Sequence, residues 1–169
     1  MSWFDRARAG AALLMAFGLA GCFQPLYSEA SHPGLVADLR AVEVAPIKDR
    51  IGHYLNDDLI TNLNGTGETP PSKYRLEVIV AQSSQTPTVE SQINMASAAT
   101  VIGKATFTLT RIADGALVYK SEATASAVYD RGLDSFANLR ASRDAEIRIA
   151  RSLADEIELR VAAALSAKS

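Results

Sequence analysis

Cysteine, histidine and tryptophan are scarce in this sequence, which has 1 Cys, 2 His and 1 Trp among its 169 residues. A single cysteine excludes an intrachain disulfide and any CxxC-type zinc site. Two histidines argue against a His-rich metal centre. The formal charge of −2, from 17 basic and 19 acidic residues, argues against nucleic-acid binding, which uses a strongly basic face. We therefore expect no nucleic-acid partner, no bound metal and no cofactor.

Long hydrophobic runs are also missing. The most apolar segment, residues 9–20, is too short to cross a hydrocarbon core as a helix, which takes about 20 residues. Its place behind Arg6 and Arg8 is typical of the h-region of a secretory signal peptide. We therefore expect a secreted chain with no transmembrane helix in the remainder.

This apolar segment ends in Leu19, Ala20, Gly21 and Cys22, the lipobox pattern of bacterial lipoprotein signal peptides. Small residues let the chain lie extended in a peptidase cleft, and the Cys22 thiol is the nucleophile that takes a diacylglycerol. The pattern predicts a signal peptide over residues 1–21 and a Cys22 that carries S-diacylglycerol and N-acyl (palmitate) groups. The alternative is a buried N-terminal helix in which Cys22 is an ordinary small core residue.

Lipid is then the expected membrane anchor of the mature chain, because three acyl chains exceed the two signals that stable anchoring takes. Phe23 follows the cysteine, whereas inner-membrane retention signals of bacterial lipoproteins typically have Asp there. This favours the outer membrane, with the protein on its periplasmic face. Residues 22–38 are expected to form the lipidated N-terminus and a tether, and residues 39–169 a single α/β domain.

Hydrophobic periodicity divides the expected domain into strands and helices. Alternating apolar residues predict four strands, over Leu39–Pro46, Tyr74–Gln82, Thr100–Ile112 and Leu117–Tyr129. Apolar residues spaced by three and four predict helices over Ile51–Asn64 and residues 136–167. The fold class is therefore α+β: a two-layer α/β sandwich with a four-stranded mixed sheet, two helices on one face and the order β-α-β-β-β-α. Residues 83–99 lack any period and predict a long loop, or partly the frayed ends of two strands.

Turn and capping residues mark the ends of these elements. Asp49 is expected to cap the first helix, and Gly65 to end it in a left-handed conformation. Asp114-Gly115 predicts a hairpin turn between the last two strands. The core face of the last strand is predicted to be Leu117, Tyr119, Ala123, Ala125, Ala127 and Tyr129. The core stripe of the last helix is predicted to be Ile147, Ala150, Leu153, Ala154, Ile157, Val161, Ala164 and Leu165.

A search for catalytic patterns finds no G-x-S-x-G, P-loop, H-E-x-x-H or G-x-G-x-x-G motif. His53 and Asp57 are one helical turn apart and could pair as a base and its orienting group, but no nucleophile accompanies them. An exposed histidine at a helix end is the favoured interpretation. Asp57 and Asp58 point about 100° apart on a helix, which favours a solvated face over a metal site. We expect a protein without enzymatic activity and without catalytic residues.

The first residues of the expected mature chain carry a resemblance to a known family. Cys22-Phe23-Gln24-Pro25-Leu26-Tyr27 resembles the start of the mature LPS-assembly lipoprotein LptE family, where C-G-F-x-P-L-Y is typical. The glycine is missing here, whereas Phe23, Pro25, Leu26 and Tyr27 agree. The predicted order of elements also resembles that family. The alternative is that this segment is an apolar plug against the domain's own sheet edge or core.

The resemblance implies a binding function at the inner leaflet of the outer membrane. A member of this family forms a one-to-one complex with the β-barrel LptD, stands partly inside its lumen, and assists both barrel assembly and delivery of lipopolysaccharide to the outer leaflet. The open face of the predicted sheet suits a polar barrel lumen. It is made of Lys104, Thr106, Thr108, Thr110, Lys120, Glu122, Thr124 and Ser126. Any solvent-facing sheet carries similar residues, so this match stays open.

Arginine and lysine are the residues that suit the phosphates of lipopolysaccharide. The candidate contacts with lipopolysaccharide or the barrel are Lys48, Arg50, Lys104, Lys120 and Arg131. Further cations near predicted strand ends are Arg111, Arg140 and Arg143. Chain direction predicts that Lys48, Arg50, Arg131 and the 83–99 loop share one end of the sandwich, and an ordinary solvated charge is the alternative at each position.

Two other functions remain open from the sequence. One is an auxiliary lipoprotein of an ABC-type lipid transporter, against which the Phe23 and Pro25-Leu26-Tyr27 start argues. The other is a lipid-tethered periplasmic enzyme, which a deep pocket lined by His53 and carboxylates would support.

Overall fold

The computed structural model describes residues 34–65, 70–86 and 98–167. The chain divides into two compact units, residues 1–36 and 37–169. Only residues 34–36 of the first unit are among those described, and they lead into helix α2 (Leu35–Arg40). The fold of the second unit is built from the remaining elements.

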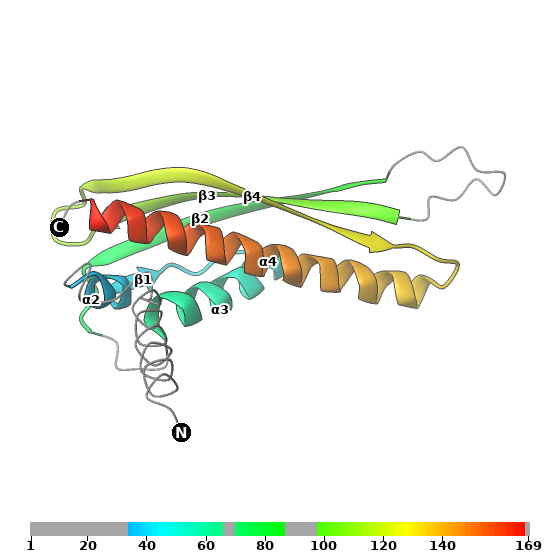
Figure 1. The fold of residues 1–169 in the computed structure, drawn as a ribbon, viewed down its shortest axis with the longest axis horizontal. Helices are drawn as coiled ribbons and strands as arrows, with labels where there is room; N and C mark the ends of the chain where they lie inside the picture. The colour runs from blue at the N-terminus through cyan, green and yellow to red at the C-terminus, as the bar shows by residue number, and fades with distance from the viewer. Residues whose placement is uncertain (1–33, 66–69, 87–97, 168–169) are drawn as a thin grey trace, which may run out of the picture. The chain divides into compact units, whose positions relative to one another are not determined.

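The second unit is a sheet covered by helices on one side (Figure 1). Its elements are β1 (Val42–Val44), α3 (Arg50–Asn64), β2 (Tyr74–Gln85), β3 (Ala98–Arg111), β4 (Leu117–Asp130) and α4 (Ser135–Ser166). The sheet has four strands in the order β1-β2-β3-β4, with β1 parallel to β2 and the other pairs antiparallel. Helices α3 and α4 pack against each other and against the strands. The predicted α+β two-layer sandwich and its element order are confirmed.

The core lies between the sheet and the two helices, where apolar side chains of both layers meet. In the central strand β3 every second residue is buried, as predicted, and Phe107 and Leu109 are fully enclosed. Helix α3 buries Ile51, Leu55 and Leu59, which recur every four residues and therefore share one face. This is the pattern from which the helix was predicted.

Helix α4 begins at a side-chain cap that the sequence analysis did not single out. The Asp134 carboxylate accepts hydrogen bonds from the N–H groups of Phe136 and Ala137, which satisfies two backbone donors of the first turn. The predicted core stripe is largely confirmed, and Ile157 is completely buried. The stripe is rotated at its start, because Ile149 is buried where Ile147 is only half-buried.

The start of the sheet differs from the prediction of a strand over Leu39–Pro46. Helix α2 extends to Arg40, and Ala41 N–H donates to the Ala37 carbonyl at 3.1 Å, which continues the helical pattern. Strand β1 is therefore limited to Val42–Val44. The apolar spacing in 35–41 fits a helix as well as a strand, and packing decided between them.

Leu117 was predicted on the core face of the last strand, and this is wrong, since its side chain is 59% exposed. A register shift between Leu109 and Thr110 places Leu117 opposite Thr110, while Leu109 pairs with Tyr119. Thr110 belongs to the open face of the sheet, so Leu117 faces the same side. A one-residue shift moves a side chain to the other face because strands alternate with a period of two.

Two predicted helix ends differ in their outcome. Gly65 has a positive φ of 62° and its N–H donates to the Thr61 carbonyl at 2.9 Å, as expected for a glycine that ends a helix. Asp49 occupies the N-cap position of α3, but its side chain makes no capping hydrogen bond. Within the described ranges no helix is both long and apolar enough to cross a membrane.

Candidate interaction surface

The lipobox residues Leu19, Ala20 and Gly21, the acceptor Cys22 and the motif residues lie outside the described residues. The motif consists of Phe23, Pro25, Leu26 and Tyr27. Their assignment therefore stays a prediction from the sequence. Of the segment predicted over 83–99 as a loop or as strand ends, β2 takes the first residues up to Gln85 and β3 the last from Ala98, and residues 87–97 lie outside those described.

The open face of the sheet carries paired charges rather than isolated ones. Lys104 of β3 forms an ion pair of 2.8 Å with Glu122 of β4, and Thr106 Oγ1 donates to the same carboxylate at 3.3 Å. The hydrogen bond from Lys104 holds the pKa of Glu122 below its usual value, and Lys120 on the same face adds a further positive potential. Lys104 is therefore already engaged within the sheet, while Lys120 is exposed beside it.

Further along this face, at the β1 end, Arg75 lies between two acidic side chains. Its guanidinium nitrogens approach Glu43 at 3.9 Å and Glu77 at 3.6 Å. All three side chains are about half exposed, so each pair adds only a few tenths of a kcal/mol to stability. The open face is thus polar and nearly charge-balanced in this region.

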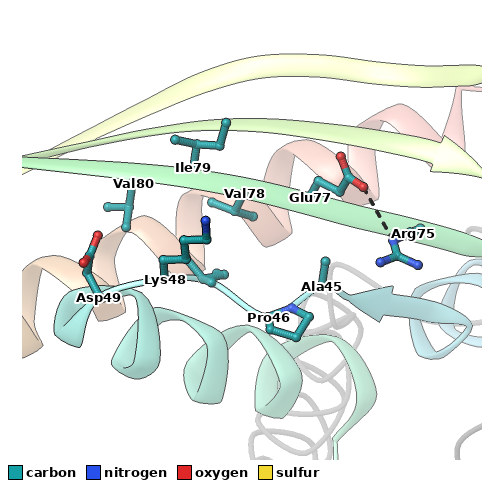
Figure 2. Close-up of a pocket in the computed structure, with 10 residues that line it drawn as sticks. Ala45, Pro46, Lys48, Asp49, Arg75, Glu77, Val78, Ile79 and Val80 are labelled. Atoms are coloured by element: carbon teal, nitrogen blue, oxygen red, sulfur yellow. Dashed lines mark ion pairs between the residues drawn. The ribbon is translucent and has the colours of Figure 1, made fainter.

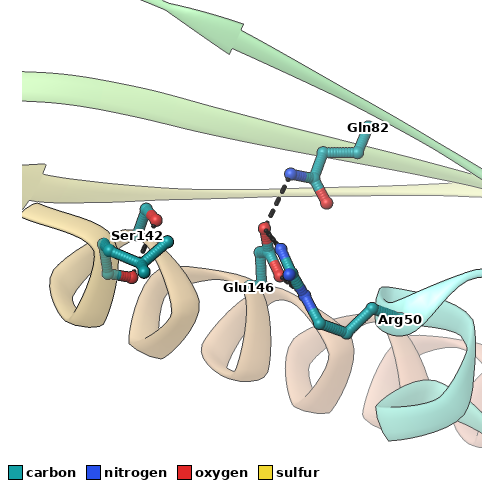
Figure 3. A network of polar contacts seen from close by, with 5 residues as sticks. Arg50, Gln82, Ser142 and Glu146 are labelled. Carbon is teal, nitrogen blue, oxygen red and sulfur yellow. Dashed lines mark hydrogen bonds and ion pairs between the residues drawn. The ribbon is translucent and has the colours of Figure 1, made fainter.

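Arg50, one of the candidate cations, has a structural partner. Its guanidinium donates to both carboxylate oxygens of Glu146, at 2.9 and 2.7 Å, and Gln82 donates to the same carboxylate at 3.1 Å (Figure 3). Burial tends to raise the pKa of Glu146, but the hydrogen bonds from Arg50 and Gln82 outweigh it and hold that pKa below the usual value. Arg50 therefore ties α3 to α4 and β2.

Lys48 lines a surface cavity of about 490 Å³ beside β2 (Figure 2). The segment from Ala45 to Asp49 forms one wall, and residues 77–80 of β2 form the other. Val78 and Val80 lie on the cavity side of the strand, whereas Ile79 points to the opposite side (Figure 2). The cavity combines apolar side chains with charged residues of both signs, since Lys48, Asp49, Arg75 and Glu77 also line it, and it lies at an edge of the sheet.

Arg131 comes directly after β4, whose last residue Asp130 pairs with Ala98. Arg50 lies at the level of Gln82, which is aligned through Gly103 with position 125 of β4. At about 3.3 Å per residue, Arg131 and Arg50 are therefore separated by roughly 20 Å along the sheet. The structure places these cations in the same half of the sheet but does not bring them together into one site.

A second cavity, of about 370 Å³, lies on the first turns of α4. It is lined by Phe136, Arg140, Arg143 and Ile147 among others. The Arg140 guanidinium carbon stands 5.8 Å from the centre of the Phe136 ring, a cation–π contact. Phe136 is 63% exposed, so this surface is apolar and basic together.

The one catalytic pairing considered from the sequence is loose and open to solvent. His53 Nε2 lies 3.6 Å from Asp57 Oδ2, and both side chains are more than 60% exposed. No cluster of three or more His, Cys, Asp or Glu side chains with metal-binding geometry occurs in the part of the chain that the structure describes. Neither the His53–Asp57 pair nor a metal cluster therefore forms part of the candidate interaction surface among the described residues.

Solved structures share this architecture. A protein of Caulobacter crescentus CB15, described as a candidate lipoprotein, superposes with a TM-score of 0.65 at 23% identity, over 80% of this chain and 98% of its own. The fold is one found in bacterial lipoproteins. Rare lipoprotein B of Shewanella oneidensis gives a TM-score of 0.54 at 12% identity, over 72% and 93% of the two chains.

An uncharacterized lipoprotein B of Nitrosomonas europaea gives a TM-score of 0.52 at 14% identity, over 75% of this chain and 84% of that one. No protein family and no curated protein sequence matches the chain. At these identities the likeness concerns the fold. It shows that the order of strands and helices here is the one that several lipoproteins adopt.

Two residues that organise the surface were missed by sequence reasoning. Glu146 is only 4% exposed and lies within the buried stripe of α4. Arg160 pairs with Glu156 on its own helix, and it also donates to the Glu122 carbonyl and to Ser121 Oγ of β4. A carboxylate inside an apolar stripe was the available signal for Glu146, whereas the sequence carries no sign of the contact between Arg160 and the strand.

Proposed function

We propose that this protein is a lipid-anchored lipoprotein of the outer membrane that acts in lipopolysaccharide assembly, as its resemblance to the LptE family implies. In this function it binds the β-barrel LptD, stands partly within the lumen, and assists both barrel assembly and delivery of lipopolysaccharide. It works by binding, without catalysing a reaction. Cys22 carries the lipid, and the domain faces the periplasm.

The observation that carries the proposal is a coincidence of two independent features. The sequence places a lipobox before Cys22 and follows it with Phe23, Pro25, Leu26 and Tyr27. The domain behind this start has the fold of solved lipoproteins over nearly their whole length. A signal peptide occurs with many folds, and this fold can serve many functions. The combination of the two therefore narrows the range of possible functions.

The surface of the domain agrees with a binding function in a polar environment. Its open sheet face carries hydroxyl side chains and charges that are paired within the sheet, as between Lys104 and Glu122. A barrel interior is polar too, so the hydroxyl groups and the paired charges of this face suit it. Lys120 and Arg131 remain candidate contacts for phosphates, because both are exposed.

Affinity purification of a C-terminally tagged full-length chain from detergent-solubilised outer membranes tests the proposal. We expect a large β-barrel protein in stoichiometric amount. Recovery of inner-membrane transporter components would favour the auxiliary lipoprotein of an ABC-type lipid transporter instead. Recovery of the tagged protein alone would contradict a stable complex with a barrel.

A further inference from the structure

The two edges of the sheet differ in how their backbone groups are used. At the β4 edge, side chains of α4 reach the strand: Arg148 Nη2 donates to the Val128 carbonyl at 3.0 Å, and Arg160 donates to the Glu122 carbonyl. Residues 122 and 128 are separated by an even number of positions, so both carbonyls point the same way. These two arginines occupy acceptors that an additional strand would use.

The other edge is formed by β1 for only a short distance. Strand β1 pairs Val42–Val44 with Tyr74–Leu76, and the last bond runs from Ala45 N–H to the Leu76 carbonyl at 2.9 Å. Pro46 has no N–H to continue the ladder. The chain then leaves the sheet toward α3, and the 490 Å³ cavity opens between it and β2 (Figure 2).

Beyond Leu76 the outer edge of β2 presents a row of backbone groups. Because Leu76 faces β1 and strand residues alternate, Val78, Val80, Gln82 and Ser84 direct their N–H and C=O groups outward. Within the described ranges no backbone hydrogen bond reaches these groups from that side. Figure 1 shows this end of β2 running past the start of α3, and residues 81–86 are all exposed.

This stretch also lacks the features that usually protect an edge strand. Proline, β-bulges and charged side chains prevent strand addition in natural proteins. From Val78 to Gln85 the strand has neither a proline nor a charge, and it pairs with β3 without a register shift. Ile79 is 75% exposed on the open face. An unprotected edge of this length can pair with an incoming strand, whereas arginines of α4 occupy carbonyls at the opposite edge, formed by β4.

We infer that the outer edge of β2, from Glu77 to Gln85, binds an extended segment of the partner protein as an additional strand in line with β1. The inference rests on the proposed function and names how the barrel is held: the segment is an uncharged loop or terminal stretch of the β-barrel protein. The backbone groups of Val78, Val80, Gln82 and Ser84 supply the hydrogen bonds. One side chain of the segment lies beside Ile79, and its neighbours point into the cavity beside Val80.

The charge and polarity of the β2 edge favour an uncharged segment of the barrel protein as its binding partner. The edge is bordered by Gln82, Ser83, Ser84 and Gln85, which match the polar, loop-filled lumen of a barrel. The charges near it are of both signs: Lys48 and Asp49 lie on one wall and Arg75 and Glu77 at one end, and the Arg50–Glu146 pair is joined to Gln82. A charged strand would therefore gain nothing along most of the edge, whereas an uncharged one is accepted throughout.

Ser84→Pro in the full-length, tagged chain tests this inference. The N–H of Ser84 points outward, so proline removes a donor from the edge and leaves the β2–β3 ladder intact, while Ser84→Ala keeps the donor and serves as the matched control. We expect Ser84→Pro to lower the amount of co-purified barrel about five- to tenfold relative to Ser84→Ala. Circular dichroism of both variants checks that they melt at the same temperature.

A second pair of variants tests the same edge without proline. Ile79→Lys places a charge beside the incoming strand, and Val128→Lys places one on the same face at the protected edge, where Val128 is 55% exposed. We expect loss of the barrel with Ile79→Lys only. A photo-crosslinker at position 79 is expected to label the barrel protein, and one at position 128 to do so far less.

The outcomes separate this inference from the proposed function. If a barrel protein co-purifies with the wild-type chain and also with both Ser84→Pro and Ile79→Lys, the β2 edge is not the docking site. Only this inference then fails. If the wild-type chain brings down no barrel, the proposed function fails and the inference with it. Cross-links at position 79 between two copies of this chain would assign the edge to self-association and overturn the inference.

Discussion

The guanidinium of Arg50 binds both carboxylate oxygens of Glu146, at 2.9 and 2.7 Å, across two helices that are far apart in the sequence. Glu146 is nearly buried, and Arg50 is about half exposed. The pair fixes the start of α3 against α4 and, through Gln82, against β2. Arg50, which the sequence suggested as a contact for phosphate, therefore has a structural role.

Replacing Arg50 should therefore destabilise the domain. Arg50→Met leaves Glu146 buried with only Gln82 as a donor, and we expect the free energy of unfolding to fall by ~2 kcal/mol, below the range for a fully buried pair because Arg50 is half exposed. Urea denaturation followed by circular dichroism measures this. Arg111→Met, which breaks the exposed pair with Asp114, is the control and should change stability by less than about 0.5 kcal/mol. Equal losses in the two variants would contradict a special role for Arg50.

Glu146 should also make stability depend on pH. Its pKa in the folded protein lies below the unfolded value, because Arg50 and Gln82 stabilise the carboxylate more than burial disfavours it. The folded state therefore binds the proton less readily, so the stabilisation is present above the unfolded pKa of about 4.3 and is lost as pH falls through the lower folded value. Glu146→Gln should show a smaller decrease in unfolding free energy between pH 5 and 3 than the wild type, measured by urea denaturation at each pH. An identical decrease would contradict this assignment.

Gly103 of β3 is required for close packing of α4 on the sheet. A Cβ at this position would lie 2.5 Å from Ile149 Cγ2 and 3.3 Å from Leu153 Cδ1. Gly103→Ala should lower the free energy of unfolding by about 1–3 kcal/mol, because the helix must move outward. Gly132→Ala, where a Cβ would meet nothing within 4 Å, is the matched control and should leave the melting temperature nearly unchanged.

Asp49 adopts a backbone conformation that is unfavourable for any residue with a Cβ. Its φ is 69° and its ψ 169°, a region occupied almost only by glycine, and its side chain makes no capping bond to offset this. We expect Asp49→Gly to raise the free energy of unfolding by about 1 kcal/mol. Asp49→Asn keeps the Cβ and should give no gain. A destabilised Asp49→Gly variant would show that the side chain contributes in another way.

The stripe of α4 is core only on one side of the helix, which two neighbouring substitutions can show. Ile157 is completely buried, whereas Leu159 is 51% exposed. Ile157→Asp should unfold the domain, because an unpaired buried charge destabilises by several kcal/mol, while Leu159→Asp should melt close to the wild type. An unchanged melting temperature for Ile157→Asp would mean that the packing of α4 is not as described.

Lipidation is tested independently of the domain. Cys22→Ala removes the thiol that the lipobox presents, so the precursor should remain uncleaved or be mislocalised. Membrane fractionation and the mobility of the chain on gels report both effects. Ser28→Ala, a change behind the motif, serves as the control and should fractionate as the wild type does. Normal outer-membrane fractionation of Cys22→Ala would contradict the assignment of the protein as a lipoprotein.

The order of the elements and most of the core could be predicted from the sequence alone. Period-two alternation in β2, β3 and β4 and the four-residue spacing of Ile51, Leu55 and Leu59 are local properties, so they are legible without any contact information. The helix end at Gly65 and the hairpin turn at Asp114-Gly115 could be predicted for the same reason, since in each case the glycine meets a backbone requirement of its own turn. The lipobox and the motif after Cys22 were found from the sequence as well, and they lie outside the described residues.

Features that depend on neighbours distant in the chain could not be predicted, because they are set by tertiary packing. Whether residues 39–41 continue a helix or begin a strand, and where Leu117 points, was set by packing and by a register shift that no local pattern contains. The partner of Arg50 and the contact between Arg160 and the Glu122 carbonyl exist only because α4 lies against the sheet. The unequal edges of the sheet follow from the same cause: β1 ends early and leaves the outer edge of β2 beyond Leu76 unpaired among the described strands, while α4 places arginines against two carbonyls of β4.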